Sequence, residues 1–197
     1  PAICLGTPSL SVYEMTAAHC TFTNKGVYTE PVVITRIEDK AGNVLEEFVP
    51  KTHEVMNEQT AYAMMNLMEG VVRYGSGIRL KYKYKLEPPM AGKTGTTQNQ
   101  SDGWFIGHTP DLVTGVWVGC EDRASHFRTI REGQGASMAL PIWALYYQKI
   151  YADKSISIST GPFERPEGEL GVELDCDKYD KLSRGTQDRF SDTEIEF

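Results

Sequence analysis

The chain has 197 residues, a length that suits one domain with or without a small appendage and can bury a sizeable core. Its composition, 40% apolar and 24% charged, is typical of a soluble globular protein; its apolar runs are too short for a transmembrane helix, and no signal peptide pattern is present. Of the net charge of −7, residues 162–197 contribute −6, from 11 acidic and 5 basic residues. Such a chain is a poor partner for nucleic acid.

The cysteines and histidines are spaced too irregularly to indicate a metal site. There are four of each, at Cys4, Cys20, Cys120 and Cys176, and at His19, His53, His108 and His126. No two cysteines form the Cys-x-x-Cys pair that common zinc sites use. We therefore expect no metal and no cofactor. We interpret the cysteines as buried free thiols, and any disulfide pairing is left open.

The first third of the sequence predicts a helix followed by a hairpin. Residues 9–22 have apolar side chains near helical spacing, and Ser11 and Glu14 form a candidate capping box at the start. Residues 31–37 and 44–49 are rich in β-branched side chains and flank a polar turn that contains glycine. This pattern predicts a small β-hairpin.

Residues 57–74 give the strongest helix prediction, with Asn57 as the N-cap and a wide, methionine-rich apolar stripe that we interpret as core. The next segment, residues 79–85, alternates basic residues with tyrosine or leucine. Strips that bind single-stranded nucleic acid use such interleaving. An extended segment with one solvated face is the simpler prediction.

Three short strands follow, over residues 90–97, 104–108 and 112–119. The turns between them are short, which predicts an antiparallel meander. The third strand is apolar almost throughout, so we expect it to be buried on both faces.

Residues 135–151 predict a final helix. Its expected inner face consists of Met138, Ile142, Leu145, Tyr146 and Ile150. Residues 156–197 are rich in proline, glycine and acidic residues with little periodicity, and predict an acidic tail or a small appended element. The main unit is thus expected to span residues 1–155.

A Lys-Thr-Gly-Thr run opens the meander, at Lys93 to Thr96. Taken alone, three of these residues recur by chance and fit a glycine turn or an edge strand. In a strand that faces a cleft, however, the Lys93 cation, the two threonine hydroxyls and the backbone N–H groups near Gly95 suit a substrate carboxylate and a developing oxyanion. Because side chains alternate along a strand, Thr94 and Thr96 point one way and Lys93 the other.

The run lies in a series of segments that are AGKTGTT (91–97), DGWFIGHTP (102–110), GVWVG (115–119), AICLGT (2–7), FTNKGV (22–27), QTAY (59–62), GVV (70–72) and ALPIW (139–143). With these segments, the sequence resembles the transpeptidase domain of class A, bifunctional penicillin-binding proteins, whose motif set includes Lys-Thr-Gly together with Ser-x-x-Lys. The resemblance covers roughly residues 2–150 in order.

The resemblance implies the α+β fold of penicillin-binding proteins and β-lactamases, an antiparallel sheet flanked by helices, here incomplete at its N-terminal side. It assigns Lys93 and Thr96 to catalysis, and Thr94, Gly95 and Thr97 to substrate binding. Lys93, Thr94 and Thr96 would bind the substrate carboxylate. The Thr96 N–H would form half of the oxyanion hole, and Gly95 would let the acyl group approach.

The family cross-links peptidoglycan: a serine attacks a D-Ala-D-Ala stem peptide, releases the last D-Ala and passes the acyl group to an amine on a neighbouring stem. β-Lactams trap that serine. The resemblance therefore implies stem peptides as partners and a place in the bacterial cell envelope, on the outer side of the inner membrane. Membrane contact and a glycosyltransferase domain are expected in an upstream part of a longer protein.

The sequence departs from the family at the nucleophile. No lysine has a serine three residues before it, and no asparagine has a serine two residues before it, so both the Ser-x-x-Lys and the Ser-x-Asn motifs are missing. We expect a C-terminal fragment that is inactive alone and that binds β-lactams only as part of a complete domain. The strand over residues 112–119 would then lose a neighbour, and its edge would permit self-association.

Two alternatives remain open. The first is a relative of the serine β-lactamases or D,D-carboxypeptidases. The second is a non-catalytic module that binds cell-wall peptide or a protein partner through the same sheet.

Overall fold

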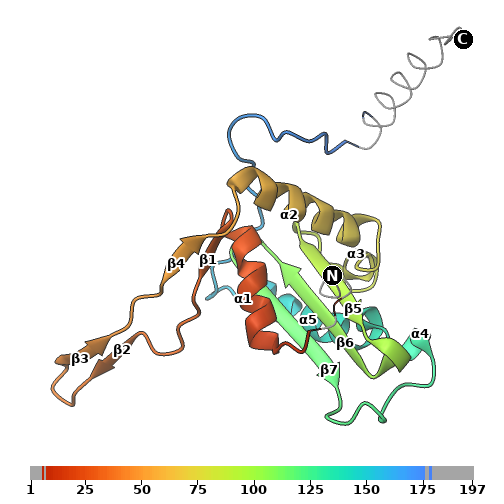
Figure 1. The fold of residues 1–197 in the computed structure, drawn as a ribbon, viewed down its shortest axis with the longest axis horizontal. Helices are drawn as coiled ribbons and strands as arrows, with labels where there is room; N and C mark the ends of the chain where they lie inside the picture. The colour runs from red at the N-terminus through yellow and green to blue at the C-terminus, as the bar shows by residue number, and fades with distance from the viewer. Residues whose placement is uncertain (1–5, 7, 176–177, 179–197) are drawn as a thin grey trace, which may run out of the picture.

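The computed structural model describes residues 6, 8–175 and 178, and its centre is a three-stranded antiparallel sheet (Figure 1). The strands are β5 (Ala91–Thr96), β6 (Asp102–His108) and β7 (Val113–Gly119), in the order β5-β6-β7. The predicted meander is confirmed. A short 3₁₀ turn, η2 (Gln98–Gln100), joins the first two strands.

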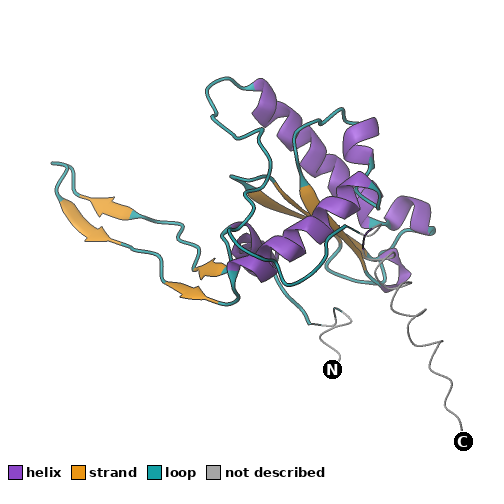
Figure 2. Cartoon of the chain, turned by 90° about the horizontal axis from the view of Figure 1, so that it is seen from above, coloured by secondary structure: helices purple, strands orange, loops and turns teal. Residues whose placement is uncertain are grey.

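Helices cover both faces of this sheet (Figures 1 and 2). Helices α1 (Val12–Thr23) and α2 (Glu58–Arg73) lie on one face, where Met65 and Met68 of α2 pack against Ala91. Helix α5 (Gly135–Ala152) lies on the other, where Trp143 packs against Phe105. The short helices α3 (Arg79–Tyr82) and α4 (Ile130–Gly133) complete the body.

The main core lies between α5 and the sheet. Trp143 and Tyr147 are fully buried and stack with ring centroids 3.7 Å apart, and Phe105 meets Trp143 edge to face at 5.4 Å. A Cβ atom on Gly107 would lie 2.5 Å from the Trp143 ring, so only glycine lets the helix approach the strand this closely.

Both predicted N-terminal caps are confirmed, although α1 begins three residues later than the predicted start at residue 9. The Ser11 hydroxyl accepts from the Glu14 N–H while the Glu14 carboxylate accepts from the Ser11 N–H, which completes the capping box. The Asn57 side chain caps α2 by accepting from the Thr60 N–H at 2.8 Å.

The predicted hairpin is also confirmed, although its strands are shorter than expected. Strands β2 (Arg36–Glu38) and β3 (Val44–Glu47) pair at the tip, and β1 (Val27–Thr29) and β4 (Thr52–Glu54) pair at the root. Together, residues 27–54 form an arm that projects from the body (Figures 1 and 2).

The extended segment predicted over residues 79–85 is wrong. The chain forms α3 there, and Leu80 and Tyr84 are both buried. Alternation of basic and apolar residues fits a strand, but residues four apart also share one side of a helical turn. Leu80 and Tyr84 are four residues apart. The helical conformation therefore buries both side chains on one side, which an extended segment with one solvated face would not require.

Two burial predictions are wrong as well. No residue of β7 is buried, because β7 is an edge strand in the described sheet, and Trp117 is 39% exposed. On α5, Met138 and Ile150 are buried as expected, but Ile142, Leu145 and Tyr146 are 51%, 53% and 47% exposed. The helix has two apolar stripes, and it buries the one that contains Trp143 and Tyr147.

The cysteines were expected to be buried free thiols, and this prediction holds only in part. Cys20 and Cys120 are free, but Cys20 is half-buried and Cys120 is exposed. Cys4 and Cys176 lie outside the described residues, as do residues 2–5 and 7 of the resemblance and half of the predicted tail, residues 176–177 and 179–197. Within the described part of the chain, no helix has the length and apolar character needed to cross a membrane.

Candidate functional site

The Lys-Thr-Gly-Thr run forms β5, which is an edge of the sheet. Two hydrogen bonds at the strand ends fix which residues bond to which neighbour. The Thr97 N–H donates to the Asp102 carbonyl, just beyond the paired part of β5 and β6. The Thr109 N–H donates to the Leu112 carbonyl, just beyond the paired part of β6 and β7. Because bonded positions alternate in antiparallel pairs, the odd-numbered residues of β5 bond to β6. The N–H and C=O groups of Gly92, Thr94 and Thr96 therefore face outward along the open edge.

The threonine side chains share the α5 face of the sheet. Thr94 and Thr96 pair with Phe105 and Gly103, and those two positions face α5. Lys93 lies on the opposite face, but its Nζ returns to the edge and donates to the Thr94 carbonyl at 2.8 Å. The edge of β5 thus brings the cation, a hydroxyl and outward backbone N–H groups together. Lys93 and Thr96 are exposed, and Thr94 and Gly95 are half-buried.

Ser76 joins this edge, which the sequence did not indicate. Its hydroxyl lies 2.7 Å from the Thr94 hydroxyl. In the sequence, Ser76 stands in a Gly-Ser-Gly run at residues 75–77, which indicates no more than the end of a helix. Ser76 is 18 residues from Thr94, so only the fold brings the two hydroxyls together.

The start of α5 also meets the edge. The Gly135 N–H donates to the Thr96 hydroxyl at 3.1 Å, and the N-cap residue Gln134 makes no side-chain cap of its own. Thr96 therefore caps α5 from another element. A Cβ atom on Gly135 would collide with the carbonyl oxygens of Gly95 and Trp104, so glycine is needed for this approach. The positive end of the α5 dipole consequently lies beside the edge, where it favours an anion.

Thr97 is placed differently from the other predicted site residues. Its hydroxyl accepts from the Asp102 N–H at 3.1 Å and lies 3.0 Å from the Ser101 hydroxyl. These bonds close the β5–β6 turn, in which Asn99 and Gln100 have φ values of 58° and 56°. The Thr97 side chain thus supports the turn, and a role in binding substrate stays a prediction.

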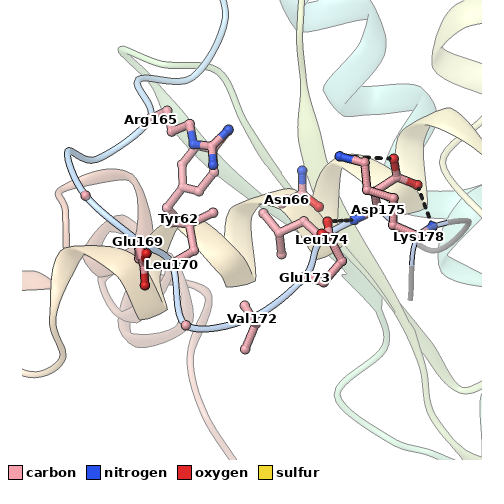
Figure 3. A pocket seen from close by; sticks show the side chains of 12 residues that line it. Tyr62, Asn66, Arg165, Glu169, Leu170, Val172, Glu173, Leu174, Asp175 and Lys178 are labelled. Atoms are coloured by element: carbon pink, nitrogen blue, oxygen red, sulfur yellow. Dashed lines mark hydrogen bonds and ion pairs between the residues drawn. The ribbon is translucent and has the colours of Figure 1, made fainter. Parts of the chain in front are cut away.

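A hollow away from β5 lies beside α2 (Figure 3). It has a volume of about 820 Å³ and lies between Tyr62 and Asn66 of α2 and a second set of residues, which are Arg165, residues 168–175 and Lys178. None of the residues of β5 lines it. It is therefore a separate feature of the surface.

A buried histidine pair links α1 to the sheet. His108 Nε2 lies 3.0 Å from His19 Nδ1, and His108 Nδ1 lies 3.2 Å from the Thr23 hydroxyl. Burial lowers the pKa of His19 to about 4, and burial together with the neighbouring His19 lowers the pKa of His108 to about 3. Both rings are thus neutral at pH 7. Among the described residues, no group of three or more His, Cys, Asp or Glu side chains could hold a metal ion.

A family model and individual proteins of known family match most of this chain. The family model of the penicillin binding protein transpeptidase domain matches residues 4–122. Penicillin-binding protein 1A of Aquifex aeolicus is 36% identical over 149 residues, which are 76% of this chain and 20% of that protein. Penicillin-binding protein 1B of Vibrio cholerae is 32% identical over 187 residues, which are 92% of this chain and 23% of that protein. The chain thus spans less than a quarter of these two relatives.

Solved structures show the same fold. Penicillin-binding protein 1A from Haemophilus influenzae matches 80% of this chain and 29% of its own, with a TM-score of 0.69 and 22% identity. The penicillin-binding protein PonA1 from Mycobacterium tuberculosis matches 87% of this chain and 45% of its own, with a TM-score of 0.67 and 26% identity. The predicted α+β transpeptidase fold, an antiparallel sheet between helices, is confirmed.

Proposed function

Because this chain belongs to the penicillin-binding protein transpeptidase family, we propose that it supplies one wall of a peptidoglycan D,D-transpeptidase active site. The observation that carries the proposal is the open edge of β5. There Lys93 Nζ, the Thr94 hydroxyl and the outward N–H of Thr96 lie on one short stretch of backbone. Such a set binds a carboxylate and stabilises an oxyanion.

In the proposed reaction, a D-Ala-D-Ala stem peptide lies along this edge. Its terminal carboxylate accepts hydrogen bonds from Lys93 and Thr94, and its scissile carbonyl oxygen lies near the Thr96 N–H. A serine outside this chain attacks the carbonyl carbon, and the C–N bond to the last D-Ala breaks as that amine takes a proton. An amine of a second stem peptide then displaces the serine oxygen and completes the cross-link.

The positive end of α5 adds to this wall. Thr96 is fixed by the Gly135 N–H, so its backbone N–H is held in place before a ligand arrives. Ser76 orients the Thr94 hydroxyl in the same manner. Donors that are fixed in advance need no reorganisation when charge develops on the substrate oxygen.

We propose that the chain is inactive alone, since it has no Ser-x-x-Lys motif. Two uncovered apolar surfaces support a role as part of a larger domain. One is the stripe of Ile142, Leu145 and Tyr146 on α5, and the other is the edge of β7 with Trp117. In that setting β-lactams bind the complete domain, in the cell envelope, while a membrane segment and a glycosyltransferase domain belong to the longer protein.

A second candidate function is a non-catalytic module that binds cell-wall peptide. The observation that favours it is the intact edge of β5 in a chain without the family's nucleophile. The experiment below tests the binding that both candidates share.

Titration of the ¹⁵N-labelled chain with diacetyl-Lys-D-Ala-D-Ala should shift the backbone amides of Thr94 and Thr96. Replacing Lys93 by glutamine removes one charge-assisted hydrogen bond and should weaken binding by about ten-fold. Replacing Lys81, an exposed lysine on α3, by glutamine is the matched control and should leave the affinity unchanged.

The same peptide with a C-terminal amide lacks the carboxylate and should bind at least as weakly as the Lys93→Gln variant binds the free acid. Equal binding of the acid and the amide, or shifts confined to residues remote from β5, would contradict a carboxylate site at this edge.

A further inference from the structure

The arm, residues 27–54, exposes an unusual amount of apolar surface. Seven large apolar side chains between residues 33 and 49 are exposed, from 38% for Phe48 to 86% for Val33; the others are Ile34, Ile37, Val44, Leu45 and Val49. Every residue of β2 and β3 is exposed, and both views show the arm projecting from the body (Figures 1 and 2). Apolar side chains gathered on a projecting element mark an interaction surface.

The backbone of the arm is open at one point. The Glu30 N–H donates to the Lys51 carbonyl at 2.8 Å and the Phe48 N–H donates to the Thr35 carbonyl at 2.9 Å, and these two bonds bracket a gap in the pairing. Pro31 and Pro50 lie in the gap and have no N–H to donate. Among the described residues, no hydrogen bond engages the backbone of residues 32–34 or of Val49. The strands separate there around a hollow of about 520 Å³.

The hollow is lined by both apolar and charged residues. The apolar ones include Val32, Val33, Ile34, Phe48 and Val49, and the charged ones are Glu30, Glu47 and Lys51. An extended peptide could therefore bond to the free backbone groups and bury its alternate side chains against the valines.

The charge of the arm selects among the peptides that could bind. Residues 27–54 contain six acidic residues and three basic ones, a net of −3. One basic residue, Arg36, is already paired with Glu38. Two arms would repel one another, so the charge disfavours a second copy of this chain. A partner with lysine or arginine beside apolar residues is complementary.

We propose that the open segment of the arm, residues 30–34 and 47–51, is a docking site for an extended, basic, apolar segment of another protein. The bound segment adds a strand in the gap, places apolar side chains on Val33 and Val49, and directs its cations to Glu30 and Glu47. This site is separate from the edge of β5. Its test is therefore independent of the test of the proposed enzymatic role.

The test uses a soluble peptide that repeats Lys-Val-Thr-Val and its counterpart that repeats Glu-Val-Thr-Val. Added to the ¹⁵N-labelled chain, the basic peptide should shift the amides of Val32, Val33, Ile34 and Val49, and the acidic peptide should not. The Val33→Ser, Val49→Ser double variant should weaken binding by at least about ten-fold, because two apolar contacts are lost.

The matched control is Leu67→Ser, which changes an apolar side chain that is 67% exposed on α2, away from the arm. It should bind the basic peptide as the unaltered chain does. Absence of binding, equal binding of the two peptides, or shifts outside the arm would overturn the proposal. So would self-association of the chain, measured by sedimentation, that the double variant abolishes, since it would show that a second copy is the occupant.

Discussion

The Trp143→Ala variant is expected to lose about 3–5 kcal/mol of its free energy of unfolding, measured by urea denaturation followed by circular dichroism. Trp143 is fully buried, stacks on Tyr147 and meets Phe105 edge to face. Its removal deletes the largest side chain of the core and leaves a cavity between α5 and the sheet. A loss of this size is a large part of the stability of a domain.

The neighbouring variant Ile142→Ala is the matched control for the orientation of α5. Ile142 is 51% exposed on the other apolar stripe, so its truncation should change the free energy of unfolding by less than about 1 kcal/mol. If Trp143→Ala fails to fold, the milder variant Trp143→Phe replaces it. Its loss of free energy of unfolding should exceed that of Ile142→Ala and stay below the value expected for Trp143→Ala. A larger loss for Ile142→Ala than for Trp143→Ala would show that the helix buries the stripe predicted from the sequence instead.

Acidification from pH 7 to pH 5 is expected to remove about 2 kcal/mol of stability for each histidine of the buried pair. In the folded chain the pKa of His19 is about 4 and that of His108 about 3, because burial disfavours their charged forms. In the unfolded chain both pKa values return to near 6.5, the reference value. The unfolded state therefore binds more protons below pH 6.5, and stability falls as pH falls through that value.

The range above pH 5 separates this effect from the titration of most carboxylates, whose reference pKa values lie near 4. Urea unfolding at several pH values should show the slope in the unaltered chain. The double variant His19→Gln, His108→Gln should lose that slope, whereas His126→Gln, which changes an exposed histidine, should keep it. A slope that survives the double variant would mean that other groups carry it.

Local signals predicted much of the fold. The capping box of Ser11 and Glu14 and the Asn57 cap depend on residues three apart, so the sequence contains all the information that they need. The meander followed from short turns between apolar runs. The burial of β7 and the inner face of α5 could not be predicted in this way, because burial depends on what covers a surface and not on how apolar it is.

In the candidate site, too, the local features could be predicted from the sequence and the tertiary contacts could not. The Lys-Thr-Gly-Thr run and the alternation of its side chains could be read from the sequence. Ser76 and Gly135 could not, because they are 18 and 39 residues from Thr94 and Thr96, respectively, and only the fold brings them together. The cap that Thr96 provides for α5 is likewise a tertiary contact that no local pattern encodes.

We propose that this chain carries the substrate-binding wall of a transpeptidase and lacks the nucleophile. Incubation with a fluorescent penicillin, followed by a denaturing gel, shows whether the chain contains a group that penicillin acylates. A complete penicillin-binding protein with a Ser-x-x-Lys motif serves as the positive control on the same gel. We expect the control to carry a fluorescent band and this chain to carry none at the same concentration. A stable band on this chain that disappears when the chain is first incubated with unlabelled penicillin would show that the chain has a nucleophile of its own.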